Sequence, residues 1–334
     1  MALYVNGNKV CISKQIKEDG IGIPREVSSQ GVYQIPSNLS TFTLPKNATD
    51  LRVSALYYAF QRCISLTTVD LSSLTTVSGT NGMSGTFQNC TNLTTVDLSS
   101  LTTVSGGSGM NSAFYGCTNL TTVDLSSLTT MSGNNGMQGA FQVCASLTSI
   151  DLSSLTTVSG SNGMNSTFRG CTSLTSVDLS SLTTVSGSNG MYYAFYGCTN
   201  LTSVNFNNLE TIGSDTSGSN IGHFYNCFSG CANLTSVSFP SLEKIYCTGS
   251  AASNGTFYGN TFIEKFYFPK LNTITYGTGA SAANQVACQN IFSGCSSLTE
   301  IHFGAANQSA IEASAGYSTL WGRGAGNATV YFDL

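Results

Sequence analysis

Charged residues are scarce in this chain of 334 residues. Lysine, arginine, aspartate and glutamate together form 8% of it, against about 25% in typical globular proteins. With 12 basic and 16 acidic residues, no basic run and a formal net charge of −4, the chain lacks the electrostatic footprint of a nucleic-acid-binding protein. Apolar residues still make up 41%, so the composition is not that of a disordered protein.

Long apolar runs are also missing. No stretch approaches the roughly 18 apolar residues of a transmembrane helix. The first residues, MALYVNGNKVCISKQIKEDG, lack the basic start, apolar centre and small-residue cleavage site of a secretory signal. We therefore expect no membrane insertion and no Sec signal in this sequence.

Residues typical of catalysis are few. Histidine occurs only as His223 and His302, and no GxSxG, P-loop or HExxH motif is present. We predict that the protein is not an enzyme, that it uses no cofactor or metal, and that both histidines are structural.

What the chain does have is a repeat. Cys63, Cys90, Cys117, Cys144, Cys171 and Cys198 are each 27 residues apart, and the unit then lengthens, with matching positions at Cys231, Asn260 and Cys295. A short unit such as CTSLTSVDLSSLTTVSGSNGMYYAFYG cannot bury its own apolar residues. Stacking such units gives a continuous core, which predicts a solenoid.

The pattern inside a unit predicts its local structure. The segment Leu174–Leu179 ends in the alternation of a short strand, and corresponding segments begin at ten places. These starts are Leu39, Leu66, Leu93, Leu120, Leu147, Leu174, Leu201, Leu234, Ile263 and Leu298. We expect them to form one parallel sheet on the concave side. GMYYAFYGC is expected to form a helical turn on the convex side with Phe195 pointing inward.

These units closely resemble the BspA-like, or Treponema-type, leucine-rich repeats. Strand residues like LTSVDL, a second apolar pair like LTTV and a motif like AF-x-x-C carry the resemblance over roughly Leu39 to Phe303. An extra glycine-rich loop and Ser180-Ser181, where the family often has proline, depart from it. The resemblance implies an α/β-type leucine-rich-repeat solenoid of about ten coils, and a bacterial surface protein that binds host proteins or other cells.

The two ends are not repeats. Residues 1–35 contain LYVNGNKV, a hairpin pattern. We expect them to form a cap or a docking segment, and a homo-oligomer would form through the same residues. Residues 36–303 form the solenoid, and residues 304–334, which end in GNATVYFDL, are expected to cap it with a closing strand.

The repeated cysteines are predicted to be reduced. Stacked neighbours point their Cβ atoms in the same direction, which disfavours an unstrained disulfide, and a buried cysteine is usually a small hydrophobic residue. The pairing of Cys11, Cys227, Cys247 and Cys288 stays open.

Two surfaces are candidates for binding. On the concave face we expect a column formed by Thr68, Asp70, Asp97, Asp124, Asp151, Asp178 and Asn205. We predict that each aspartate accepts a hydrogen bond from the backbone just after it, in preference to a row of calcium sites. Because neighbouring carboxylates repel, Asp124 is expected to titrate above an ordinary aspartate.

The convex edge is the other candidate. Its residues vary most from coil to coil, and tyrosine gives a large contact area at low entropic cost. The tyrosines concerned are Tyr57, Tyr58, Tyr115, Tyr192, Tyr193 and Tyr196.

The leading functional hypothesis is a non-enzymatic adhesion protein that recognises a protein or glycan on another cell or host surface. The alternative is a phage or prophage virion component, such as a tail or receptor-binding protein. An ice-binding array of threonine hydroxyls, including Thr75, Thr102 and Thr129, is a remoter alternative. The expected location is extracellular, on the cell surface or in a virion, with the cytoplasm left open.

Overall fold

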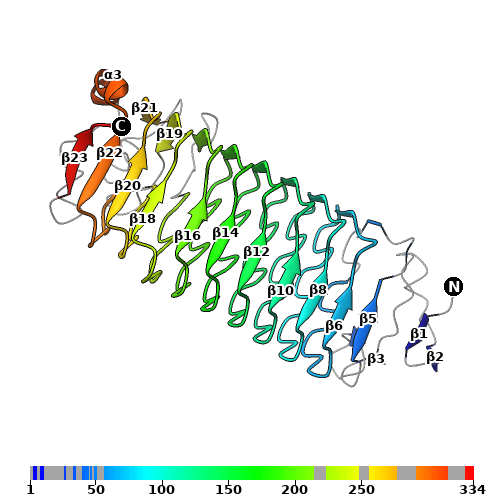
Figure 1. Ribbon diagram of the computed structural model, residues 1–334. Helices are drawn as coiled ribbons and strands as arrows, with labels where there is room; N and C mark the ends of the chain where they lie inside the picture. Colours follow the sequence, from blue (N-terminus) through cyan, green and yellow to red (C-terminus); the bar gives the residue numbers. More distant parts are fainter. Residues whose placement is uncertain are drawn as a thin grey trace.

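The computed structural model shows stacked coils that form an elongated solenoid (Figure 1). It describes residues 3–5, 8–10, 26–27, 33–34, 40–44, 46, 49–50, 56–213, 223–247, 256–276, 291–314 and 328–334. The leucine-rich-repeat solenoid expected from the sequence is therefore confirmed.

One row of parallel strands comes from the TVD-like segments. The strands are β5 (Thr41–Thr43), β6 (Thr68–Asp70), β8 (Thr95–Asp97), β10 (Thr122–Asp124), β12 (Ser149–Asp151), β14 (Ser176–Asp178), β16 (Ser203–Asn205), β18 (Ser236–Ser238), β20 (Lys265–Phe268) and β22 (Glu300–Phe303). β5 to β16 form a 7-stranded sheet, and β18 continues the row beside β16. Each of the ten predicted segments contains one of these strands.

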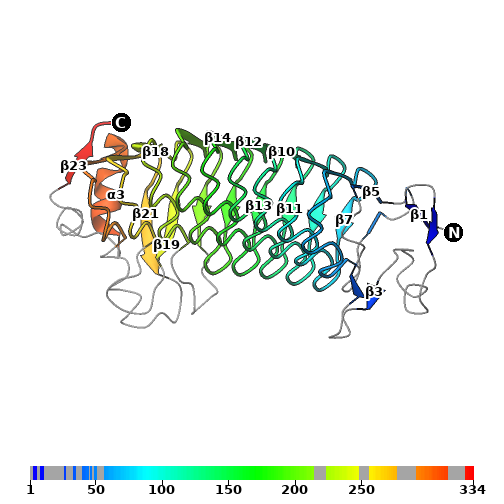
Figure 2. The ribbon, with the colours of Figure 1, turned by 90° about the horizontal axis from the view of Figure 1, so that it is seen from below.

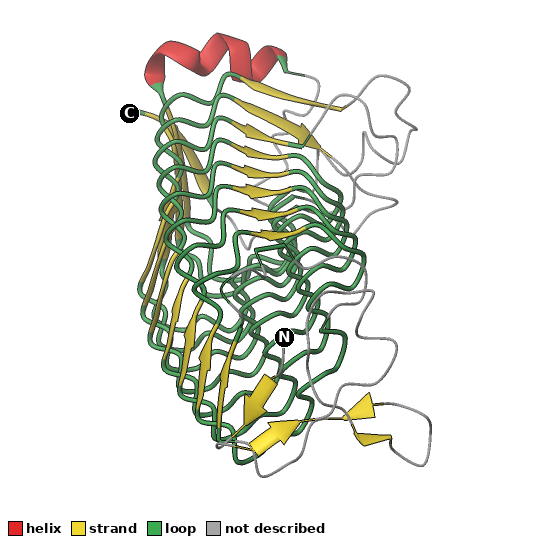
Figure 3. Ribbon diagram, turned by 90° about the vertical axis from the view of Figure 1, so that its right-hand side faces the viewer, coloured by secondary structure: helices red, strands yellow, loops and turns green. Residues whose placement is uncertain are grey.

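A second parallel sheet, which the sequence did not lead us to expect, is built by the second apolar pair of each coil. Its strands are β7 (Thr76–Val77), β9 (Thr103–Val104), β11 (Thr130–Met131), β13 (Thr157–Val158), β15 (Thr184–Val185), β17 (Thr211–Ile212), β19 (Lys244–Cys247) and β21 (Thr273–Tyr276). The two rows of strands lie at an angle to each other, and green turns complete each coil (Figure 3).

The predicted helical turn on the convex side is wrong. The run from the glycine-rich loop to the cysteine is a chain of tight turns in which alternate amides bond to the next coil. Phe168, for example, donates to the carbonyl of Ala194 at 2.8 Å, whereas Cys171 donates to Phe168 within its own coil. The run requires positive φ at every fourth residue, as at Asn162, Ser166 and Gly170, and such angles are incompatible with an α-helix. We call this run, equivalent to residues 160–171, the turn edge.

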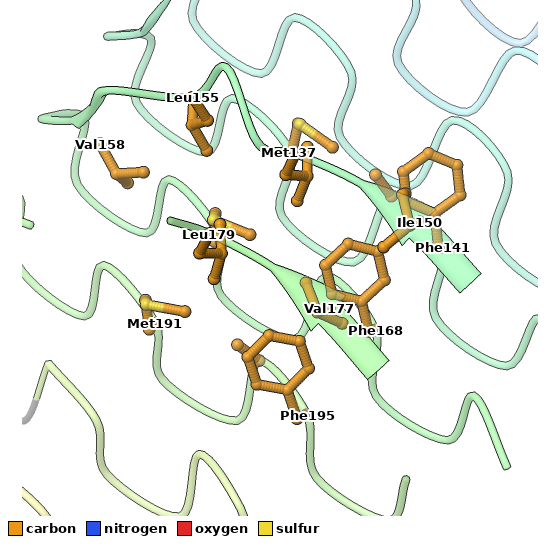
Figure 4. Packing of buried hydrophobic residues seen from close by; sticks show 14 of the residues in the cluster. Met137, Phe141, Ile150, Leu155, Val158, Phe168, Val177, Leu179, Met191 and Phe195 are labelled. Atoms are coloured by element: carbon orange, nitrogen blue, oxygen red, sulfur yellow. The ribbon is translucent and has the colours of Figure 1, made fainter. Parts of the chain in front are cut away.

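The core repeats from coil to coil. Phe87, Phe114, Phe141, Phe168 and Phe195 are fully buried, and successive rings stack with centroids 5.2–5.7 Å apart. Figure 4 shows three of these rings beside the strand residues Ile150 and Val177. The inward direction predicted for Phe195 is thus confirmed.

The cysteine column is also buried, and its thiols are free. From Cys90 onward, each thiol of the column donates to the carbonyl of the phenylalanine one coil earlier, as Cys117 does to Phe87 at 3.1 Å. Burial raises the pKa of Cys117 to about 12, so the group stays a thiol. Cys227 is likewise free and buried, whereas Cys11 and Cys288 and the side chain of Cys247 lie outside the described residues.

The later coils depart from this regularity at Asn260, the position that holds cysteine in other coils. The amide of Asn226 donates to the carbonyl of Tyr258 at 2.6 Å, and the next alternate amide, that of Phe228, bonds to a side chain. The Asn260 Oδ1 atom accepts that hydrogen bond at 2.8 Å. Its Nδ2 donates to the carbonyl of Phe257 at 2.8 Å. Asn260 is fully buried.

Both ends carry additional strands. β1 (Leu3–Val5) and β2 (Asn8–Val10) form the expected antiparallel hairpin, and β3 (Glu26–Val27) pairs with β4 (Tyr33–Gln34). At the other end, η1 (Ala305–Asn307) and α3 (Gln308–Ala313) follow β22, and α3 lies at the C-terminal end of the solenoid (Figure 2). β23 (Thr329–Phe332) then adds to β22 in parallel register.

Candidate binding surfaces

The aspartates lie in one straight row on the outer surface of the first sheet. Asp70 pairs in register with Asp97, Asp97 with Asp124, Asp124 with Asp151 and Asp151 with Asp178. The residue just before the aspartate in each strand, such as Val96, Val123 or Ile150, is buried in the core. Thr68, Thr95 and Thr122 lie beside the aspartates and are exposed. We call this surface the Asp face, and it brings together all the residues predicted for it, with Asn205 next in register.

Each aspartate is held by a turn, as predicted. The Oδ1 atoms of Asp70, Asp97, Asp124, Asp151 and Asp178 accept a hydrogen bond from the amide two residues later, at 2.9–3.0 Å. Asn205 accepts the same bond from Asn207 at 3.1 Å. The turn uses one oxygen and leaves the rest of each carboxylate facing outward.

The expectation that Asp124 titrates above an ordinary aspartate is wrong. The hydroxyl of Ser126 donates to Oδ1 at 2.7 Å and its amide donates at 3.0 Å. These two hydrogen bonds lower the pKa of Asp124, and the small burial of the carboxyl opposes them only in part. Local hydrogen bonding therefore outweighs repulsion along the row, because the neighbouring carboxylates are exposed to water.

A shallow groove of about 690 Å³ runs over the N-terminal part of the Asp face. Its walls include Thr43, Thr68, Asp97, Asp124 and Asp151. The groove crosses five neighbouring strands, so an extended ligand could contact several aspartates at once.

The same column changes character towards the C-terminus. Tyr267, His302 and Tyr331 follow in register on β20, β22 and β23. The imidazole lies between the two phenol rings, with centroids 4.9 and 4.7 Å away. Sequence reasoning missed this stack because the spacing is no longer 27 residues; the alternation in KFYF, EIHF and TVYF was the available signal.

His302 also links two acidic groups. Its Nε2 lies 2.9 Å from Glu300 and its Nδ1 lies 2.9 Å from Asp333, while Lys265 pairs with Glu300 at 2.9 Å. Partial burial of the ring disfavours its charge, but the hydrogen bonds to Asp333 and Glu300 and their negative charges outweigh it and raise the pKa of His302.

The candidate tyrosines on the turn edge form two groups. Tyr57 and Tyr58 contact each other at one end, with centroids 4.5 Å apart. Tyr192, Tyr193 and Tyr196 cluster further along. Tyr115 belongs to a coil between the groups.

Sequence reasoning missed two members of the second group. Tyr225 stacks on Tyr192 at 4.8 Å, and Tyr258 stacks on Tyr225 at 4.7 Å. Both lie in the longer coils, where the repeat spacing changes.

The threonines considered for ice binding use their donors internally. The hydroxyl of Thr102 donates to the carbonyl of Thr75, and that of Thr129 donates to Thr102, at 3.0 and 3.1 Å. The hydroxyl oxygens of these threonines can therefore only accept hydrogen bonds from outside the protein, and one such acceptor occurs in each coil.

The described residues include both histidines, and His302 lies against Glu300 and Asp333. His223 is fully buried, and burial lowers its pKa to about 4, so the ring is neutral. Within the same residues, no three histidine, cysteine, aspartate or glutamate side chains gather as metal ligands would. Nor is any helix there long and apolar enough to span a bilayer.

Comparison with known families gives a match to the BspA type leucine-rich repeat region, with six copies. The matches cover residues 30–135, 108–217, 164–280 and 216–319, which is most of the chain. The comparison with curated proteins found no match.

Solved structures with similarity include a leucine-rich repeat protein from Bacteroides ovatus, with 20% identity and a TM-score of 0.45 over 92% of this chain and 74% of that one. A leucine-rich cell surface protein from Faecalibacterium prausnitzii has 15% identity and a TM-score of 0.22 over 91% and 94%. The Toll–Spätzle complex from Drosophila has 14% identity and a TM-score of 0.30 over 89% and 33%.

Proposed function

Because the chain belongs to the BspA-type leucine-rich repeat family, we propose that it is a non-enzymatic binding protein that recognises a partner protein through the Asp face. Leucine-rich repeats generally serve as scaffolds for protein interaction, and the open surface of a solenoid suits an extended partner. We further propose that this recognition takes place at a cell or host surface, as in adhesion.

The observation that carries the proposal is the distribution of charge. Between Ile64 and Leu209 the chain has six charged residues, five aspartates and Arg169. Their sum is −4, which equals the net charge of the whole chain. All five negative charges lie in one row on the Asp face, and four of them, Asp70, Asp97, Asp124 and Asp151, line the groove. Such a field attracts a basic segment of a partner and speeds its association.

The row also offers a matched way to test the idea. Asn205 makes the same turn as the aspartates, so Asp→Asn substitutions keep the local structure and remove the charge. We expect a short polylysine peptide to bind the native protein, with affinity that falls as salt rises from about 50 to 150 mM. Isothermal titration calorimetry should show a loss of about tenfold or more for the triple variant Asp97→Asn, Asp124→Asn, Asp151→Asn.

An Arg62→Gln variant, on the turn edge, serves as the control and should bind like the native protein. Equal binding by the triple variant would refute recognition through the Asp face. The proposed location at the cell surface is tested by antibody labelling of intact producing cells, which should be labelled. Label confined to phage particles would support the virion alternative instead.

A further inference from the structure

Arg169 is the one basic residue between Ile64 and Leu209, and it lies on the turn edge. Its guanidinium carbon is 5.1 Å from the centre of the Tyr196 ring and 5.7 Å from that of Tyr193. Arg169 is exposed, and among the described residues no carboxylate pairs with it. The charge is therefore held by aromatic rings and not neutralised by an acid.

The tyrosines hold one another in place. Tyr193 contacts Tyr196 edge to face at 5.3 Å and Tyr192 at 4.3 Å. Asn226 Nδ2 donates to the Tyr193 hydroxyl at 3.3 Å. Mutual packing of this kind fixes the rings before any ligand binds, which lowers the entropic cost of binding.

A guanidinium beside aromatic rings remains a strong donor. The rings interact with its charge, and the planar group retains N–H donors that can hold a carboxylate through two parallel hydrogen bonds. The ring faces also attract the cation, which holds the guanidinium in position for such a contact. Tyrosine and arginine are also the residues that most often dominate protein interfaces.

We propose that Arg169, Tyr193 and Tyr196 form a docking site for an acidic peptide segment of a partner protein. The carboxylate pairs with Arg169, and the neighbouring side chain of the peptide packs on Tyr196, which is 37% exposed. The site is separate from the Asp face and opposite in charge, so the two proposals stand or fall independently.

The test uses a short polyglutamate peptide, the full chain and isothermal titration calorimetry. The native protein should bind the peptide, and Arg169→Gln should weaken binding by about tenfold or more. Arg169→Lys keeps the charge but loses the forked donors, so it should restore only part of the affinity. Tyr196→Ser should also weaken binding.

Arg62→Gln is the matched control, because Arg62 is an exposed arginine on the same edge, in the coil that contains Tyr57 and Tyr58. It should leave binding unchanged, and all variants should keep the native melting temperature. Three results would overturn the proposal: no binding by the native protein at millimolar peptide, equal binding by Arg169→Gln, or an equal loss in Arg62→Gln. Binding of a sialylated oligosaccharide without binding of the peptide would assign the site to an acidic glycan and would also overturn it.

Discussion

The coils before Leu209 and the coils after Phe224 build a similar cross-section in different ways. In the earlier coils most core positions repeat the same residue, and the stacked phenylalanine rings are nearly parallel, with 1–10° between neighbours from Phe87 to Phe195. In the later coils phenylalanines replace leucine and methionine, and tilted or edge-to-face contacts, as between Phe224 and Phe239, occur beside stacked pairs such as Phe239 and Phe268. The core side chains therefore pack in the same arrangement in every regular coil, whereas their arrangement differs from one irregular coil to the next.

The difference extends to the surface. The regular coils present a row of threonine or serine beside aspartate. The later coils place Lys265, Tyr267, Glu300 and His302 on the continuation of that row. The repeated coils therefore form a long surface with the same negative charge along its length. The irregular coils form clusters of side chains, such as the one around His302, that occur once.

The largest effect is expected where an irregular coil depends on a single side chain. Asn260→Ala removes the acceptor of the Phe228 amide and a donor to the Phe257 carbonyl. Leaving these buried groups unpaired and opening a cavity should cost about 3 kcal/mol. Urea denaturation followed by circular dichroism measures the loss.

The matched variant in a regular coil is Cys171→Ala, since Cys171 occupies the corresponding position and makes one weak hydrogen bond, to Phe141 at 3.1 Å. We expect a loss of about 1 kcal/mol there. Equal losses in the two variants would contradict the special role of Asn260.

Among the described residues, one β-branched side chain stands at a position with positive φ. Val143 has φ of 62°, which is unfavourable for a β-branched residue, whereas equivalent positions carry Asn89, Gly116 and Gly170 with similar angles. Val143→Asn should stabilise the protein by about 1 kcal/mol, because asparagine tolerates this conformation. Thermal denaturation should show a higher melting temperature.

Ile64→Asn is the control for Val143. Ile64 is also an exposed β-branched residue, at 55% exposure, but its φ is not positive. Its replacement should change the stability by less than about 0.5 kcal/mol. A similar gain in both variants would attribute the effect to polarity and not to the backbone.

The regular part of the fold could be predicted from sequence because its signal is repeated. Ten strand segments were predicted because a leucine or isoleucine recurs at the start of each segment and apolar residues alternate with polar ones after it, as around Val177. The turn edge was misread because short sequences such as MYYAF suit a helix, while the bonds that decide its structure join different coils. Asn, Ser or Gly at every fourth residue was the missed signal.

The surface was predictable only in part, for a related reason. The Asp face followed from the register of identical residues. The pKa of Asp124 did not, because repulsion between neighbours was weighed without the hydroxyl of Ser126. Tyr225, Tyr258 and His302 were missed because they lie in coils whose length changes.

The smallest predicted effect concerns the last strand of the irregular region. His302 joins β22 to Asp333, just after β23, and its pKa is raised in the folded protein. The charged ring therefore stabilises this attachment fully below the pKa of an unfolded histidine, about 6.5, and the stabilisation is lost as pH rises through the folded value. Hydrogen exchange of residues 329–334, corrected for intrinsic rates, should show more frequent opening across that window. His302→Gln should remove the pH dependence, since glutamine does not titrate, whereas persistence of the dependence in this variant would place its origin in another group.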